Sequence, residues 1–510
     1  MQQDISVNNK RIAKNTLFLY FRMIVILAIS LYTSRVVLAI LGVEDYGIYN
    51  VVGGVVTLLS FLNAALSNGS SRFITYEMGK RTEGNVKKVF QSSFIAHLIL
   101  ALAIIVIAET IGLWFVYNKL VISPERLGAA VFTYHCSIIT SFITITQVPY
   151  TALIISNEKM GIYAYISILE AILKLFVVFL LIYSPMDKLE YYAVLLCVVQ
   201  IGIALVYRIY CIRNYNEASL KRITIDLKKI KEIVFFSSWS LFGNAAHALN
   251  GQGLTIVTNM FFNPTVVAAR ALSIQVNTAV MHLIQNLGTA ANPQIVKLYS
   301  AGEIKKSQSL LLNIARYSFL MMLFVSVPLI CACKEVLGIW LVEVPDYTVI
   351  FVQLILIQSL FFTFDSCLYI GLYACGRVKE NALISPTLYI IQFFVIYLLF
   401  SWGYSPVALS VVGIITCAIA GVIVKPVLLY VLAGYSIKDV YMHIGRCVFA
   451  AILSFSAPLM VMNCFADKVW GTILKVVIGM FTAYLAIWCL GINKDERNRA
   501  ICVIKNKMHV

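Results

Sequence analysis

The sequence predicts an all-α integral membrane protein with about fourteen transmembrane helices. Of its 510 residues, 60% are hydrophobic and 13% are charged, whereas a soluble domain has roughly 45–50% apolar and about 25% charged residues. The apolar residues also form successive stretches of about 20 residues, the length that crosses a bilayer as a helix. Together these observations exclude a water-soluble fold.

Short polar connections separate the predicted spans. The first span follows a polar, basic amino terminus and runs to Ile40 without a small-residue cleavage site, so we expect a retained helix and not a signal peptide. In order, the spans are residues 16–40, 48–74, 90–115, 129–155, 163–183, 191–211, 233–261, 266–295, 310–332, 349–373, 383–400, 407–431, 445–462 and 470–490.

Lysine and arginine are distributed unevenly over the connections, and cytoplasmic loops normally carry the excess. With a cytoplasmic amino terminus, the outer connections contain only Lys119, Arg126, Lys188, Lys334 and Lys468. We therefore expect both termini in the cytoplasm. The formal net charge of +16 then serves orientation and contact with anionic membrane lipids, and no separate basic domain remains to bind nucleic acid.

The longest inner connection divides the chain. Residues 213–232 interleave lysines with apolar residues, a pattern typical of an amphipathic helix on a membrane surface. Similar small, polar ends of the second and eighth spans indicate a parallel repeat. We expect an amino-terminal lobe of six helices over 1–212, a cytoplasmic linker over 213–232, a second six-helix lobe over 233–432, and two further helices with a cytoplasmic tail over 433–510.

The connections hold no pattern typical of an enzyme. No Ser/His/Asp arrangement, metal-ligand spacing or phosphate-binding Gly-rich loop occurs, and no outer connection is long enough for a catalytic domain. Most of the 12 cysteines lie within apolar spans, where a thiol packs as a small hydrophobe. We expect a transporter without a metal or organic cofactor.

Basic residues within the spans are informative, because each costs about 2.5–3.5 kcal/mol to insert and normally faces a cavity or a partner. Arg72 and Arg316 are close enough to inner span ends to reach headgroups instead. Arg22 and Arg35 point about 140° apart around one helix, so at least one of them is expected to be structural. The candidate anion-binding residues are Arg22, Arg35, Arg72, Arg270 and Arg316.

Two acidic residues within spans are candidates for ion coupling. Asp365 has hydroxyl residues beside it in mid-span and suits a proton or cation site, or an ion pair with an arginine. Glu170 precedes Lys174 by four residues, the spacing of an intrahelical ion pair, and this structural alternative is favoured. Lys425 lies near an inner helix end, where we expect it to reach lipid headgroups.

The seventh and eighth spans are unusually polar. Exposing their amides to lipid is costly, and the close pair Gly251 and Gly253 weakens the seventh helix, so we expect both spans to line a water-filled path and the seventh to bend. A tight helix contact through small residues is the alternative. The candidate substrate-binding amides are Asn244, Asn250, Gln252, Gln275 and Asn277.

Three stretches resemble a known family. They are residues 41–49 (LGVEDYGIY), residues 263–277 (NPTVVAARALSIQVN) and residues 291–297 (ANPQIVK). The chain resembles bacterial polysaccharide transporters of the O-antigen flippase type, which belong to the multidrug/oligosaccharidyl-lipid/polysaccharide (MOP) exporter superfamily. The resemblance implies a MATE-like fold with two six-helix lobes around a central cavity and two extra carboxy-terminal helices.

The same resemblance implies a function. The protein would carry undecaprenyl-diphosphate-linked oligosaccharide to the outer leaflet of the bacterial cytoplasmic (inner) membrane, for O-antigen and lipopolysaccharide, capsule or exopolysaccharide synthesis. It implies alternating access driven by a proton or sodium gradient, with a glycan polymerase and glycosyltransferases as partners. Cavity arginines, Arg270 above all, would compensate the diphosphate charge. Two alternatives remain: a drug or cation antiporter of the same superfamily, and a membrane-embedded glycan-modifying enzyme.

Overall fold

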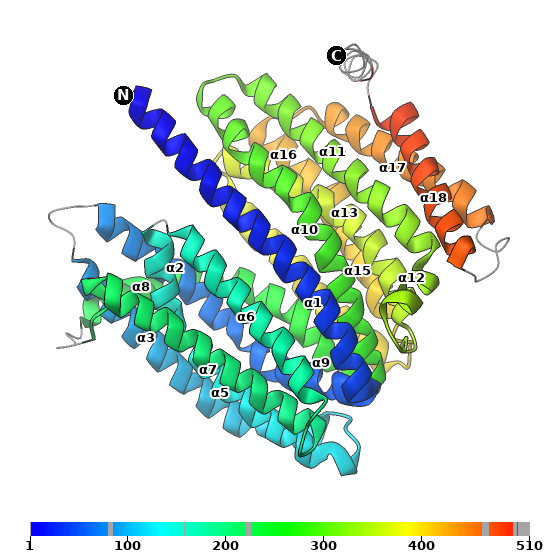
Figure 1. The fold of residues 1–510 in the computed structure, drawn as a ribbon. Coiled ribbons are helices and arrows are strands. Elements are labelled where there is room, and N and C mark those ends of the chain that lie inside the picture. Colours follow the sequence, from blue (N-terminus) through cyan, green and yellow to red (C-terminus); the bar gives the residue numbers. More distant parts are fainter. Residues whose placement is uncertain are drawn as a thin grey trace, which may run out of the picture. The chain divides into compact units, whose positions relative to one another are not determined.

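The computed structural model describes residues 2–79, 85–157, 159–220, 226–461, 469–492 and 497, and within these ranges it is helical without strands. Contacts between helices group the chain into two compact units, residues 1–268 and 269–510. The first unit holds the helices coloured from blue to green in Figure 1, and the second holds those from green to red.

The first unit begins with α1 (Gln2–Leu58), which consists of two helical segments joined at Gly42. The φ of 79° at Gly42 lies in the left-handed region that glycine adopts without strain. α1 packs mainly along α6 and α5 (Figure 1). The other elements are α2 (Ser60–Gly79), α3 (Val86–Ile107), η1 (Ala108–Gly112), α4 (Leu113–Lys119), η2 (Pro124–Arg126), α5 (Leu127–Ser156), α6 (Met160–Leu181), α7 (Lys188–Asn214), η3 (Asn216–Ala218), α8 (Leu227–Ala248), η4 (Leu249–Gly253), α9 (Leu254–Phe261) and the first turn of α10 (Pro264–Ser300).

The second unit contains the rest of α10 and the helices that come after it. Among these, η5 and η7 are π-helical segments that interrupt longer α-helices, as such segments commonly do. The elements are α11 (Ile304–Cys331), α12 (Cys333–Trp340), α13 (Thr348–Ala374), α14 (Val378–Ser401), α15 (Ala408–Ala418), η5 (Ile419–Val424), α16 (Lys425–Ala433), α17 (Ile437–Val461), α18 (Val469–Ala486) and η7 (Ile487–Gly491).

The predicted spans are confirmed as helices. Helical segments cover the described part of all fourteen to within two residues at their ends, apart from a turn at Leu59 inside the second, and several extend further, as α1 does from Gln2 and α17 from Ile437. In the part of the chain that the structure describes, ten segments are long and apolar enough to cross a membrane. The seventh and eighth spans, in which the side chains of residues 236–240 and 283–291 lie outside the described part of the chain, are not among these ten.

The connection over 213–232 differs from the prediction. α7 continues to Asn214, η3 is a short 3₁₀ turn, and α8 begins at Leu227; residues 221–225 lie outside the described residues. The side chain of Asp226 caps α8 by accepting hydrogen bonds from two backbone N–H groups, which fixes the start of the helix. The lysines after Leu227 therefore belong to the first turns of α8 and not to a separate amphipathic helix. Contacts place α8 and α9 in the first unit, and the division into lobes of six helices stays a prediction.

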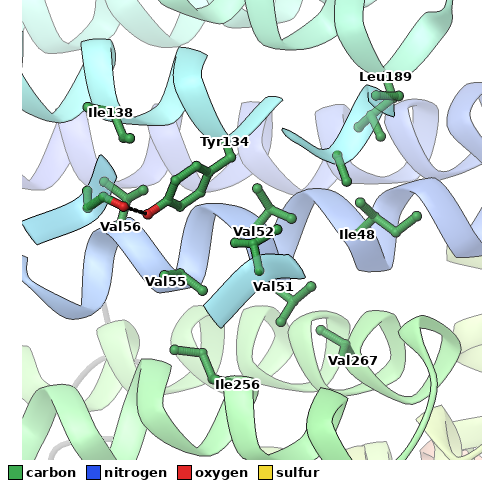
Figure 2. Close-up of a cluster of buried hydrophobic side chains, with 14 residues drawn as sticks. Ile48, Val51, Val52, Val55, Val56, Tyr134, Ile138, Leu189, Ile256 and Val267 are labelled. Atoms are coloured by element: carbon green, nitrogen blue, oxygen red, sulfur yellow. Dashed lines mark hydrogen bonds between the residues drawn. The ribbon is translucent and has the colours of Figure 1, made fainter. Parts of the chain in front are cut away.

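An apolar cluster fills the first unit around η1 (Figure 2). Valines of α1 lie around Tyr134 of α5, whose hydroxyl group donates a hydrogen bond of 2.8 Å to the carbonyl oxygen of Ala108. A Cβ atom on Gly112 would lie 2.1 Å from the same hydroxyl oxygen. The π-helical turn and its glycine thus make room for Tyr134 within the core.

Three connections predicted on the outer side meet at one end of the first unit. Arg126 donates hydrogen bonds of 2.6 and 2.8 Å to Asp45 of α1, and of 2.6 and 3.0 Å to Asp187, which caps α7. A planar guanidinium can bind two carboxylates in this way. The hydrogen bonds from Arg126 hold the pKa of Asp187 below its usual range. We call these three side chains the outer clamp, since they tie α1, α5 and α7 together.

A second ion pair joins connections at the other end of the first unit. Lys88 of α3 lies 2.8 Å from Asp226, the residue that caps α8. The hydrogen bond from Lys88 and those from the α8 backbone lower the pKa of Asp226. This contact brings together the two connections, near residues 85 and 226, that are predicted to face the cytoplasm.

The second unit is built around α11 and α13, where Phe319 and Phe364 stack with ring centres 4.7 Å apart. α17 and α18 pack on α11, and a Cβ atom on Gly479 of α18 would lie 2.9 Å from the Cα atom of Pro328. Lys475 of α18 forms a buried ion pair with Glu335 of α12. α17 and α18 therefore belong to this unit through close packing on α11, and α18 also through the ion pair of Lys475 with Glu335.

Candidate functional site

The first unit contains a polar cavity of about 570 Å³ between α1, α5, α6 and α7. Its volume falls in the range of roughly 300–1,000 Å³ that is usual for ligand sites. Hydroxyl and amide groups dominate its wall, which also carries the charged side chains of Glu170 and Lys174. The other polar residues of the wall are Ser30, Thr33, Ser34, Thr144, Gln147, Thr151, Tyr163, Ser167, Tyr192, Gln200 and Tyr207.

Glu170 and Lys174 form an ion pair in this wall. The Nζ atom of Lys174 lies 2.6 Å from Oε1 of Glu170, so the predicted intrahelical pair is confirmed. The two side chains remain 27% and 43% exposed, which leaves both able to contact a ligand in the cavity. A role of Glu170 in ion coupling stays a prediction.

A smaller cavity of about 220 Å³ shares Thr144 with the larger one. The residues around it are uncharged, and its polar members include Asn63, Ser137, Thr140 and Ser141. The first unit therefore offers a polar compartment with a charge pair next to a smaller compartment whose surface is mainly apolar. The hydroxyl groups of the larger cavity can donate and accept hydrogen bonds, which suits polyhydroxylated ligands.

The second unit contains a buried charge pair between Asp365 of α13 and Lys425 of α16. The Nζ atom of Lys425 lies 3.2 Å from Oδ1 of Asp365, and the side chains of Lys425 and Asp365 are 2% and 10% exposed. Lys425 also donates hydrogen bonds to Asn381 and, at 3.0 Å, to Ser385 of α14. One lysine thus joins three helices.

Two tyrosines complete this cluster. Tyr389 of α14 donates a hydrogen bond of 3.5 Å to the second carboxylate oxygen of Asp365. The Nζ atom of Lys425 lies 5.5 Å from the ring centre of Tyr369, within the range of a cation–π contact. The carboxylate and the ammonium are therefore both surrounded by polar or aromatic partners.

The cluster confirms the ion pair expected for Asp365 and shows that the expectation for Lys425 is wrong. The ion-pair alternative for Asp365 is confirmed, with a lysine as partner in place of the expected arginine. Lys425 does not reach headgroups, because only 1% of the residue is exposed. The physical reason is that Lys425 faces Asp365, Asn381 and Ser385, directly after the close contact of η5 with α13 at Gly421. A role of Asp365 in ion coupling stays a prediction.

Two of the predicted anion-binding arginines are buried. Arg270, near the start of α10, is 7% exposed, and Arg316 of α11 is 0% exposed. Arg316 donates a hydrogen bond of 3.1 Å to Asn313, and its charge interacts with His443 and Cys447 of α17. Arg316 is therefore packed near α17 and does not extend to the surface. Binding of an anion by either residue stays a prediction.

The remaining arginines lie in other surroundings. Arg35 of α1 and Arg72 of α2 are exposed, and the guanidinium carbon of Arg72 lies 5.8 Å from the ring centre of Phe73. Arg22 belongs to α1, but its side chain lies outside the described residues. The structure thus does not bring these three together with a common ligand, and their predicted role is untested.

The predicted amides of the seventh span are half-buried. Asn244 lies in α8, whereas Asn250 and Gln252 belong to the π-helical turn η4. The irregularity expected at the two glycines is therefore present as a π-turn. The side-chain oxygen of Gln252 faces α1, since a Cβ atom on Gly54 would lie 3.2 Å from it.

The predicted amides of the eighth span lie in α10 and are also half-buried. Asn277 accepts a hydrogen bond of 2.5 Å from Ser359 of α13, so it joins two helices of the second unit. Gln275 lies two residues before it. Contact of either amide with a substrate stays a prediction.

Sequence reasoning missed the uncharged members of both sites. Gln147 and Gln200 line the cavity, and Asn381 and Ser385 bind Lys425. A search of the spans for amides as well as for charges would have found Gln147 and Gln200. The cavity tyrosines give no such signal, because tyrosine is common at the ends of membrane spans.

The comparisons with known proteins bear on what these sites serve. Residues 12–299, more than half of the chain, match the family model described as polysaccharide biosynthesis protein. The chain belongs to this family. No curated protein sequence matches the chain significantly.

Solved structures show the fold of this polysaccharide biosynthesis family member. An inward-facing multidrug resistance MATE family transporter of the MOP superfamily is similar with a TM-score of 0.68 and 16% identity, over 80% of this chain and 96% of that one. The lipid II flippase MurJ, in an inward closed conformation, is similar with a TM-score of 0.65 and 12% identity, over 93% and 98%. A MOP superfamily transporter from Pyrococcus furiosus is similar with a TM-score of 0.56 and 13% identity, over 94% and 97%.

These findings confirm the predicted fold and the predicted family resemblance. The polysaccharide biosynthesis family member is a multi-pass, all-α membrane protein with the MOP fold. At identities of 12–16%, the solved structures speak for the fold alone.

Proposed function

We propose that this protein is a flippase that moves undecaprenyl-diphosphate-linked oligosaccharide from the cytoplasmic to the outer leaflet of the bacterial inner membrane. The observation that carries the proposal is the polar cavity of about 570 Å³ inside a helix bundle of a polysaccharide biosynthesis family member. Its hydroxyls, amides and tyrosines match the hydrogen-bonding and ring-stacking needs of a glycan. One protein with the same fold is named a lipid II flippase.

Charge compensation supports this proposal over a drug or cation antiporter. The two acidic residues predicted to couple ions are already paired, Glu170 with Lys174 and Asp365 with Lys425. A diphosphate needs cations, and arginine binds phosphate oxygens in a bidentate manner. Arg270 is the buried arginine within the stretch that carries the family resemblance, so we assign it to the diphosphate.

The transport cycle would use alternating access driven by a proton or sodium gradient, with Glu170 or Asp365 as the coupling group. Both termini would face the cytoplasm, and the cargo would come from glycosyltransferases and pass to a glycan polymerase for O-antigen, capsule or exopolysaccharide. Fusion of a fluorescent protein or of alkaline phosphatase to the carboxy terminus tests the orientation. Fluorescence without phosphatase activity is expected.

A cellular assay tests the function. Replacement of Arg270 by alanine is expected to abolish surface glycan while the amount of protein in the membrane stays unchanged. Arg213→Ala is the matched control, because Arg213 lies exposed at the end of α7. Retained glycan with Arg270→Ala would remove this residue from the mechanism.

A reconstituted assay separates the alternatives. Liposomes that contain the purified protein and a fluorescent lipid-linked oligosaccharide should transfer the label between leaflets. Efflux of cationic drugs that is lost with Asp365→Asn would instead support an antiporter, and chemical conversion of the lipid-linked glycan would support an enzyme.

A further inference from the structure

The ammonium group of Lys425 sits in a cage of oxygen atoms. It donates hydrogen bonds to an amide oxygen of Asn381 and, at 3.0 Å, to the hydroxyl oxygen of Ser385, and a carboxylate oxygen of Asp365 lies 3.2 Å from its nitrogen as an ion pair. The hydroxyl group of Ser385 in turn lies 3.1 Å from the Asn381 oxygen. Carboxylate, amide and hydroxyl oxygens together are a ligand set typical of hard cations.

A close backbone contact holds the segment before Lys425 against the helix of Asp365. A Cβ atom on Gly421 would lie 2.6 Å from the carbonyl oxygen of Phe361 and 3.1 Å from the backbone nitrogen of Asp365. η5 and α13 therefore touch directly, one helical turn before Lys425. Asn381 and Ser385 are four residues apart on α14, so they share one face of that helix. The oxygen ligands thus come from α13 and α14, two helices that contact each other.

The charge of the cage selects a monovalent cation. Asp365 supplies one negative charge, and the described neighbours Asn381, Ser385 and Tyr389 are neutral. The side chains of Asp365 and Lys425 are 10% and 2% exposed, and an uncompensated charge is costly in such surroundings. One added positive charge balances the site, whereas a divalent ion or a second cation would leave an excess.

We propose that Asp365, Asn381 and Ser385 form a monovalent-cation site that the chain fills with its own ammonium group, Lys425, and that this site excludes sodium as long as Lys425 is present. This site goes beyond the proposed function and narrows it, because Asp365 could then couple a proton but not sodium. The site concerns cation binding in the second unit and not the identity of the cargo. Its consequence is that a sodium gradient does not act on the intact cluster.

The test uses the purified, full-length protein in detergent. Thermal stability is measured in sodium chloride and in choline chloride at equal ionic strength, for the wild type, Asp365→Asn, Lys425→Ala and Lys425→Ala with Asp365→Asn. The wild type is expected to show no sodium-dependent rise in Tm that Asp365→Asn removes. Lys425→Ala is expected to gain a sodium-dependent rise in Tm and to bind about one radioactive sodium ion per chain, as at a single site. The double variant should lose both.

Lys475→Ala is the matched control. Lys475 also forms a buried pair with a carboxylate, Glu335, in the same unit, so it shows the general effect of removing a lysine from a buried carboxylate. It is expected to be destabilised equally in both salts. A sodium effect of the same size in Lys475→Ala would overturn the proposal, because the oxygen cage would not be its cause.

Other results would also overturn it. A sodium-dependent Tm in the wild type that disappears with Asp365→Asn would show that sodium enters beside Lys425. Indifference of Lys425→Ala to sodium would show that the oxygens do not form a cation site. Lys425→Ala is also purified in parallel in the two salts, in case it folds poorly. Recovery of folded protein only in sodium chloride supports the proposal. Failure in both salts contradicts it, because sodium then does not replace the ammonium group.

Discussion

Gly421 of η5 lies directly against the carbonyl group of Phe361 in α13, with room for a hydrogen atom and not for a methyl group. The contact sets the distance between η5 and α13. It thereby determines where Lys425, four residues later, meets Asp365. The pair of Lys425 with Asp365 therefore depends on a glycine at position 421.

Gly421→Ala is therefore predicted to destabilise the second unit. The added methyl group would force η5 away from α13, and such overpacking typically costs about 1–3 kcal/mol. The measurement is the Tm of the purified variant. Gly445→Ala is the control, because a Cβ atom on Gly445 in α17 meets no atom within 4 Å, and alanine in a helix is normally favourable by roughly 0.5–1 kcal/mol. Equal stability of the two variants would contradict the prediction.

The order of the helices could be predicted from the sequence because hydropathy and length are properties of each segment alone. The pairing of Lys425 could not. Its position near an inner helix end is compatible with headgroups or with a buried partner, and the choice depends on the close approach at Gly421. Glu170 and Lys174 are the opposite case. Their spacing within one helix is visible in the sequence, and the pair is present.

The candidate site shows the same limit. The amides of the seventh span and the glycines that turn into η4 are visible as a local excess of polarity. The large cavity is formed by four helices that are distant in sequence, so no single segment reveals it. The outer clamp was missed for the same reason. Arg126 is one of few cations in the predicted outer connections, and its partners lie in two other connections.

The outer clamp gives a second prediction. Arg126→Gln is expected to lower the Tm of the protein, because it leaves Asp45 and Asp187 side by side without a cation. Arg126→Lys is expected to restore only part of the stability, since an ammonium cannot present the planar fork of donors that binds two carboxylates. A double-mutant cycle of Arg126→Gln with Asp187→Asn should be non-additive. Strict additivity would show that the clamp contributes no coupling.

Acid is predicted to weaken the same clamp. The pKa of Asp187 is lowered by the hydrogen bonds from Arg126, so its stabilisation is fully present above the unfolded-state pKa of about 3.9. It is lost as the pH falls through the lower folded-state pKa. The Tm difference between the wild type and Asp187→Asn should therefore be constant near neutral pH and should narrow under strongly acidic conditions. A difference that widens as the pH falls would contradict the assigned direction.

The pair in the large cavity provides the last prediction, which separates a structural role from contact with cargo. The side chains of Glu170 and Lys174 are 27% and 43% exposed, and an exposed pair at this spacing typically contributes about 0.3–0.5 kcal/mol. The double variant Glu170→Gln with Lys174→Gln keeps the capacity of both positions for hydrogen bonds while it removes both charges. Its Tm is expected to differ little from that of the wild type.

If the cavity holds the glycan through charge-assisted hydrogen bonds, surface glycan should nevertheless fall in cells that carry this variant, because hydrogen bonds to charged groups are roughly twice as strong as neutral ones. The single variant Lys174→Gln should have a lower Tm and less surface glycan than the double variant, since it leaves Glu170 ionised without its partner. The control is Lys188→Gln at the start of α7, outside the cavity wall, with protein level and surface glycan measured together. Unchanged glycan in the double variant would mean that the pair only holds the helix, and the cargo would then have to be sought among the neutral groups around Thr144.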